Sequence, residues 1–134
     1  MAKLNIKSKI ILKDQVIEEE VLGSFESGVI SYQEKNNTYV YIDINRNELI
    51  RENDELTMKY IFSENELTKG YIYIKELNQD LELDIKTKLI EKDSNKYKVE
   101  YIEEEETFVY EIEYAEVENE LFKTNRKRYL GSNG

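Results

Sequence analysis

The sequence contains no cysteine, no histidine and no proline, and it has only 5 glycines. The absence of cysteine excludes disulfides, thiolate nucleophiles and sulfur-ligated metal sites. The absence of histidine removes the commonest general base near neutral pH, and with it the Ser-His-Asp triad and most zinc, copper and non-haem iron sites. We therefore expect a protein that is not an enzyme, with no catalytic residues, no metal site and no cofactor.

Long apolar runs are also missing. No stretch approaches the roughly 20 apolar residues that a membrane helix needs. The first ten residues carry Lys3, Lys7 and Lys9 but lack the apolar centre of a secretory signal. The net charge of -10 repels phosphate backbones and anionic membranes. These features predict a cytoplasmic protein without a membrane partner and without nucleic acid as a partner of the main body.

The apolar residues that are present recur at every second position. Of the 134 residues 40% are hydrophobic and 36% are charged, and the two kinds alternate. Side chains at alternate positions share one face of a β-strand, so each run predicts a strand with one apolar and one wet face. The predicted apolar faces are Leu4, Ile6, Ile10 and Leu12; Val40, Ile42 and Ile44; Leu56, Met58, Tyr60 and Phe62; Leu81, Leu83, Ile85, Thr87 and Leu89; Tyr97, Val99 and Tyr101; and Phe108, Tyr110, Ile112 and Tyr114.

Short polar clusters separate these runs, at residues 35–37, 45–47, 53–54, 63–65, 78–80 and 93–95. Asn and Asp tolerate left-handed backbone, so they can form turns in a chain without proline. Strands joined by so few residues must be antiparallel. The pattern predicts an all-β antiparallel meander of roughly eight to ten strands. A closed barrel is favoured over a sandwich, because residues 81–89 and 108–114 lack the proline or inward charge that protects a sheet edge.

The composition changes near the C-terminus. Residues 118–134 contain Glu118 and Glu120 against four cations, Lys123, Arg126, Lys127 and Arg128. We expect a barrel domain over residues 1–117 and a basic tail over 118–134, with one short helical turn followed by a disordered end. The tail is the one segment suited to RNA or to an acidic protein; the alternative is a solubilising end that folds back on its own acidic barrel.

Several motifs occur in an order that resembles a known family. They are Leu49-Ile50-Arg51, Met58-Lys59 with Phe62, Tyr71 with Tyr73, the strand from Leu81 to Thr87, and the strands 97–101 and 108–114. Together they are similar to the YwiB-like family of small bacterial proteins, over residues 3–117. The resemblance implies a lipocalin-like (calycin-like) barrel and supplies no catalytic residues, since its members have no assigned activity. Where the family has Gly two residues after the Arg, this chain has Asn53, for which we expect left-handed backbone.

Six side chains form a candidate ligand-binding set if the apolar faces point inward. They are Arg51, Met58, Tyr60, Thr87, Tyr101 and Tyr110. Hydroxyl groups in an otherwise apolar barrel, with Arg51 at the mouth to meet a carboxylate, suit a small amphipathic ligand. The alternative is a filled core whose hydroxyls bond to the backbone, because bulky aromatic side chains occupy space.

Three further patterns are interpreted as surface features. The acidic runs 18–20 and 103–106 alternate faces within hairpins, so their carboxylates should not converge on a cation. Residues 43–48 begin like a calcium loop but place Arg46 among the ligands and lie between strands, which indicates a turn. The glycines have no phosphate-binding spacing.

The sequence thus leaves two functions open. The first is a non-enzymatic binder of a small amphipathic molecule. The second is a filled-core interaction module that acts through outer strand faces or the basic tail. Tyr39 and Tyr41 leave the strand 39–43 apolar on both faces, so a homodimer is a candidate partner.

Overall fold

The computed structural model describes residues 2–117, which form ten antiparallel strands. The predicted tail, 118–134, lies outside the described residues. The strands are β1 (Ala2–Leu12), β2 (Gln15–Glu26), β3 (Val29–Gln33), β4 (Tyr39–Asp43), β5 (Glu48–Glu52), β6 (Leu56–Ile61), β7 (Leu67–Ile74), β8 (Gln79–Asp93), β9 (Lys96–Glu103) and β10 (Glu106–Glu116). The described residues include no helix that is long and apolar enough to cross a membrane.

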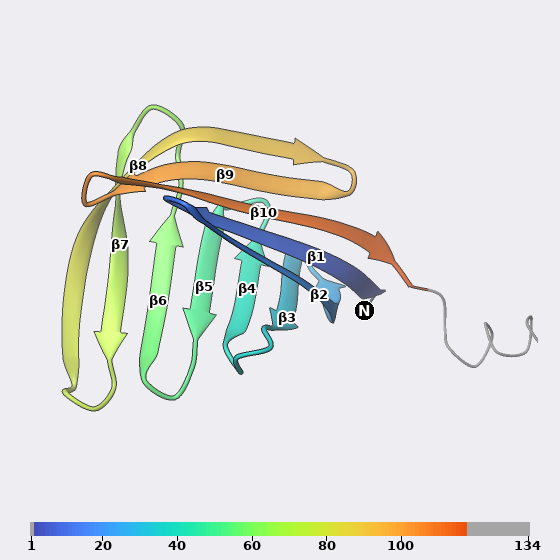
Figure 1. The fold of residues 1–134 in the computed structure, drawn as a ribbon, viewed down its shortest axis with the longest axis horizontal. Helices are drawn as coiled ribbons and strands as arrows, with labels where there is room; N and C mark the ends of the chain where they lie inside the picture. Colours follow the sequence, from blue (N-terminus) through green and yellow to red (C-terminus); the bar gives the residue numbers. More distant parts are fainter. Residues whose placement is uncertain (1, 118–134) are drawn as a thin grey trace, which may run out of the picture.

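Each strand pairs with its neighbours in sequence, and β10 closes the ring by pairing with β1. The predicted antiparallel meander closed into a barrel is confirmed. Figure 1 shows β3 to β7 running side by side, while β9, β10, β1 and β2 cross above them at a steep angle. The long β8 joins the two layers, since its first part pairs with β7 and its second part with β9. The barrel is therefore two sheets at a steep angle, joined at β8 on one side and at β2–β3 on the other.

A β-bulge lies where β8 passes from one layer to the other. Thr87 pairs with Tyr101 and Leu89 pairs with Glu100, so Lys88 is an additional residue in β8. A bulge bends a strand and shifts its alternation. The prediction that Leu89 shares the apolar face is therefore wrong, and Ile90 packs against the core in its place.

The barrel closes at β2–β3 over only four residue pairs. Gly23 to Glu26 pair with Val29 to Tyr32. A Cβ atom at Gly23 would lie 2.5 Å from the Ser31 carbonyl oxygen and 2.4 Å from Ile6 Cδ1. Gly23 therefore lets β2 and β3 approach at this seam.

The core lies between the two layers and is built from the predicted alternation. Its fully buried side chains include Ile6, Ile30, Ile42, Ile85, Tyr97, Val99 and Ile112. Asn residues make many of the turns, as predicted: Asn37, Asn47, Asn65 and Asn78 have positive φ. Asn53 does not, so its expected left-handed backbone is wrong; its Oδ1 instead accepts the backbone N–H groups of Glu55 and Leu56, each at 2.9 Å.

Candidate functional site

Polar side chains meet on the inner face of the barrel, where β3, β5, β6 and β9 contribute. We call this group the inner polar cluster. Its members are Tyr32, Glu34, Arg51, Tyr60, Tyr101 and Glu103. The alternation of each strand turns these side chains inward. Arg51 lies two residues after the buried Leu49 and so shares its face. Glu34 continues the inward face of Ile30 and Tyr32, each two residues apart. Three of the predicted residues, Arg51, Tyr60 and Tyr101, are thus brought together.

An ion pair lies at the centre of the cluster. Arg51 Nη2 donates to Glu34 Oε1 at 2.5 Å, and the side chains are 24% and 4% exposed. A charge this buried requires a partner, because desolvation otherwise costs several kcal/mol. The Arg51 guanidinium group, which we expect from the sequence to bind a ligand carboxylate, therefore binds the carboxylate of Glu34.

A tyrosine and a carboxylate form the neighbouring part of the cluster. The Tyr60 hydroxyl lies 3.7 Å from Met58 Sδ and also faces Glu103. Burial, assisted by the charge of Glu103, raises the pKa of Tyr60 to about 12. Burial also raises the pKa of Glu103, and the charges of Glu104 and Glu106 add to this effect. Glu103 is thus more easily protonated than an ordinary carboxyl group.

Tyr32 and Tyr101 complete the cluster as neutral hydroxyl groups. Burial raises the pKa of Tyr101 above its ordinary value, and Tyr60 and Glu103 add to the shift. Burial likewise raises the pKa of Tyr32, with Glu34 as the next cause. At neutral pH these groups can donate or accept hydrogen bonds but cannot serve as bases.

Four buried polar atoms on inward-facing residues have no hydrogen-bond partner among the described residues. They are Tyr32 Oη, Arg51 Nε, Glu103 Oε1 and Tyr110 Oη. Most buried polar atoms in folded proteins are paired, so each exception requires an explanation such as a bound water or a ligand. Three donors, two tyrosine hydroxyls and one guanidinium N–H, and one carboxylate oxygen are therefore available for hydrogen bonding inside the barrel.

Aromatic rings pack beneath the polar atoms. Tyr60, Phe62, Tyr101 and Phe108 form a continuous aromatic cluster with centroid distances of 5.0 to 6.3 Å. Thr87, also predicted to line a ligand site, is 1% exposed, and its Oγ1 accepts the Ser63 N–H at 3.1 Å. Met58 packs against the core. The middle of the barrel is thus occupied by side chains.

Sequence reasoning missed three members of the cluster: Tyr32, Glu34 and Glu103. Ile30, Tyr32 and Glu34 lie two residues apart, and this alternation is the sequence signal that indicates an inward position for Tyr32 and Glu34. The acidic run 103–106 predicts a solvated position for Glu103. The structure shows instead that Glu104 and Glu105 form the turn, both with positive φ, while Glu103 ends β9 facing inward.

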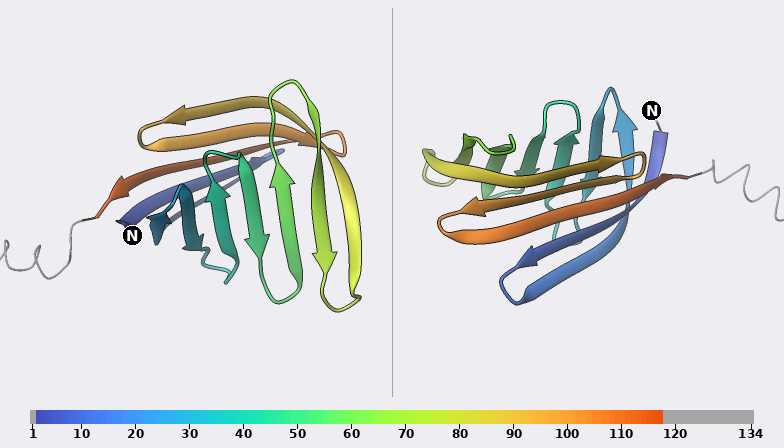
Figure 2. Two further views of the ribbon diagram at one scale, coloured as in Figure 1. Left: turned by 180° about the vertical axis from the view of Figure 1, so that it is seen from behind. Right: turned by 90° about the horizontal axis from the view of Figure 1, so that it is seen from above.

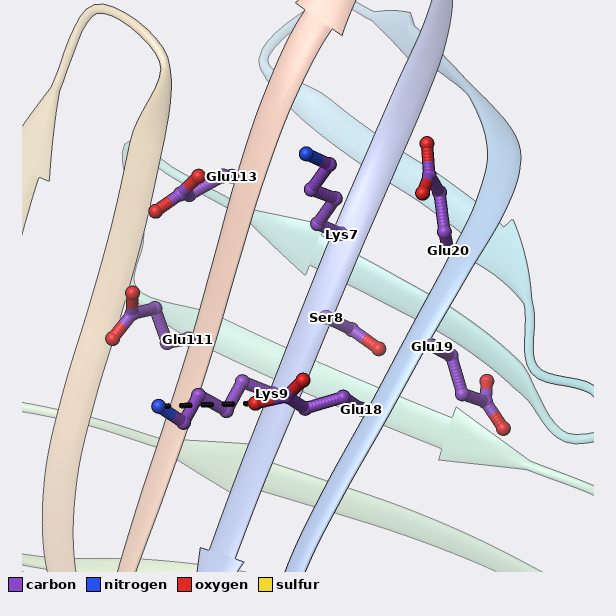
Figure 3. A pocket seen from close by; sticks show the side chains of 8 residues that line it. All are labelled: Lys7, Ser8, Lys9, Glu18, Glu19, Glu20, Glu111 and Glu113. Carbon is purple, nitrogen blue, oxygen red and sulfur yellow. Dashed lines mark ion pairs between the residues drawn. The ribbon is translucent and has the colours of Figure 1, made fainter.

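Three pockets on the described residues open on the outer surface and at the loops. The pocket in Figure 3, of about 370 Å³, is lined by Lys7, Ser8, Lys9, Glu18, Glu19, Glu20, Glu111 and Glu113. In it Lys9 pairs in register with both Glu18 and Glu111, and Lys7 with Glu20 and Glu113. Such cross-strand pairs of opposite charge each contribute about 0.2–1 kcal/mol. The charged residues that line this pocket therefore stabilise the pairing of β1 with β2 and β10.

The other two pockets lie at the loops and on an outer strand face. One, of about 530 Å³, lies between the β3–β4 and β5–β6 loops. The other, of about 300 Å³, is lined by Leu22, Gly23, Ser31, Tyr32, Gln33, Tyr39 and Tyr41. Tyr39 and Tyr41 face outward at 49% and 38% exposure.

Comparison with known proteins supports the fold. No family model matches the sequence, and no curated protein matches it. The structure is similar to the crystal structure of the YwiB protein from Bacillus subtilis, with a TM-score of 0.62 and 18% sequence identity, over 87% of this chain and 92% of that one. An identity this low carries the fold and not the activity. The chain thus has the barrel fold that is also seen in YwiB.

Proposed function

We propose that the protein is a non-enzymatic binder of a small amphipathic molecule, held at the inner polar cluster. Four buried polar atoms without partners carry this proposal: three belong to the cluster, on Tyr32, Arg51 and Glu103, and the fourth is the Tyr110 hydroxyl. Ligand sites in proteins combine an apolar lining with a few placed polar groups. Partly buried apolar side chains, including Met58, Leu83 and Phe108, supply the lining.

The charges of the cluster favour one class of ligand. Arg51 is neutralised by Glu34, so the free acceptor is Glu103 and the free donors are neutral hydroxyls and one guanidinium N–H. An anionic head group would face the carboxylate of Glu103, which has no counter-charge in the cluster. The ligand therefore has a short apolar body with a cationic or neutral polar head.

Calorimetric titration with three probes of equal chain length tests this proposal: octylamine, octanol and octanoate, each below its micelle concentration. Octylamine should bind most tightly and octanoate most weakly. Glu103→Gln should weaken octylamine binding by about 10-fold, the value of one charge-assisted hydrogen bond, and should leave octanol unaffected. Glu100→Gln, on the outward face of the same strand, is the matched control. Equal affinities for all three probes, or equal effects of the two variants, would contradict the proposal.

A second function is favoured by the outer face of β2, β3 and β4. Leu22, Tyr39 and Tyr41 are 66%, 49% and 38% exposed and line one shallow pocket. Exposed apolar groups of this kind mark association surfaces. Native mass spectrometry separates the two functions: a bare dimer that Tyr39→Ser and Tyr41→Ser convert to a monomer supports an interaction module, and a monomer with a discrete bound mass supports the ligand binder.

We infer further that the chain is a member of the YwiB-like family and of the calycin-like (lipocalin-like) barrels, and that it works in a bacterial cytoplasm. The order of its motifs and the shared fold support the family assignment. The absence of cysteine is compatible with a reducing compartment. A series of intermediate sequences that connects this chain to YwiB would test the family, and fractionation of source cells would test the location.

A further inference from the structure

Two-thirds of β2 has an unpaired backbone edge. β2 pairs with β1 from Gln15 to Phe25, but with β3 only from Gly23 to Glu26. No strand of the described part of the chain pairs with the other side of residues 15–22. In the right-hand view of Figure 2 the β1–β2 hairpin extends away from β3 to β7, with β2 as the outermost strand. Its free N–H and C=O groups are a template for another strand.

The side chains along this edge follow a simple order. Apolar residues lie at both ends, with Val16 54%, Ile17 50% and Leu22 66% exposed. Between them lie Glu18 and Glu20, which share the outer face with Lys9 and Lys7 of β1, and Glu19, which faces inward and accepts the Lys35 backbone N–H at 3.3 Å. Residues 15–22 themselves contain no cation. A matching strand would therefore carry cations in its middle and apolar residues at its ends.

A second copy of the same edge does not match. In an antiparallel pair of β2 strands, the three glutamates of one copy would lie opposite those of the other. Like charges directly across a strand pair are destabilising. The acidic run thus works against self-association and in favour of a basic partner.

We propose that the free edge of β2 binds the basic C-terminal segment, residues 118–134, of the same chain. The sequence of this segment has the complementary order. Leu121 and Phe122 come first, then the cations Lys123, Arg126, Lys127 and Arg128, and then Tyr129 and Leu130. Laid antiparallel to β2 with Thr124 opposite Leu22, the segment places Arg126, Lys127 and Arg128 opposite Glu20, Glu19 and Glu18, and it places Tyr129 and Leu130 opposite Ile17 and Val16.

The connection is long enough for this arrangement. The backbone N–H of Val117 donates to the Lys3 carbonyl at 2.8 Å, and Ala115 and Leu22 both pair with Asn5, so the end of β10 is level with Leu22. A strand added beyond β2 lies three strand spacings from β10, about 14 Å, which about five extended residues span. About eight more residues reach along the edge to Gln15, and the segment 118–134 supplies both stretches.

Disulfide trapping in the full-length chain tests the proposal, because the sequence has no cysteine to interfere. The test pair is Leu22→Cys with Thr124→Cys. The control pair is Glu82→Cys with Thr124→Cys, since Glu82 lies on β8, another acidic strand with an unpaired stretch. Under mild oxidation the test pair should form an intramolecular disulfide about 10-fold faster than the control pair. High salt, or replacement of the four cations by Gln, should remove the difference.

The other outcomes overturn the proposal in distinct ways. Equal rates for the two pairs would mean that the segment does not select the β2 edge. A disulfide that forms only between chains, at a rate that rises with protein concentration, would assign the edge to the segment of a second copy. If the test pair still forms its disulfide faster than the control pair at high salt and in the Gln variant, charge does not direct the segment to β2. Circular dichroism spectra equal to those of the unmodified chain establish that both pairs retain the barrel.

Discussion

Glu34 and Arg51 show how one residue pair can hold a polar group inside an apolar barrel. Glu34→Gln leaves Arg51, 24% exposed, without its counter-charge. Breaking such a pair from one side should lower the free energy of unfolding by about 2–3 kcal/mol, whereas an apolar replacement of both partners should recover most of this loss. Urea unfolding of Glu34→Gln, Arg51→Met and Glu34→Leu/Arg51→Met measures the coupling. Additive losses in the double variant would contradict it.

Glu103 should make stability depend on pH. Burial raises its pKa in the folded state above the unfolded value, so the folded state holds the proton more tightly. The stabilising contribution is complete below the unfolded pKa and is lost as the pH rises through the folded pKa. Glu103→Gln should therefore raise the melting temperature relative to the unmodified chain at pH 7 and lose this advantage near pH 4. Glu100→Gln, measured at both pH values, controls for the change in net charge.

Among the elements, the β2–β3 seam is the weakest part of the closure, because only four residue pairs join the two strands. Gly23→Ala would place a Cβ atom 2.5 Å from the Ser31 carbonyl oxygen, and backbone must move to accept it. Such overpacking costs about 1–3 kcal/mol. Urea unfolding and faster amide exchange in β3 measure the effect. Ser24→Ala, the neighbouring residue of β2, is the control and should cost less.

The sequence predicts the strands well because each inward face needs apolar residues at alternate positions, as in Leu56, Met58, Tyr60 and Phe62. It predicts Leu89 wrongly because the bulge at Lys88 depends on the bend between two layers, which no local pattern encodes. The sequence predicts Arg51 as a site residue but does not predict its partner Glu34. Their contact joins the residue that follows β3 to β5 across β4, and only the folded barrel brings the two side chains together.

For the molecule as a whole, the acidic run on β2 should do more than contribute to the net charge of -10. Glu18→Gln, Glu19→Gln and Glu20→Gln together leave an uncharged edge whose free backbone groups can pair with those of a second copy. Light scattering after size-exclusion chromatography should show increased dimer or larger species at neutral pH. The control changes the same number of charges on outward residues elsewhere, with Glu82→Gln, Glu100→Gln and Glu113→Gln. If both triple variants associate to the same extent, the net charge alone prevents association between copies of the chain. If only the β2 variant associates, the acidic edge of β2 prevents it.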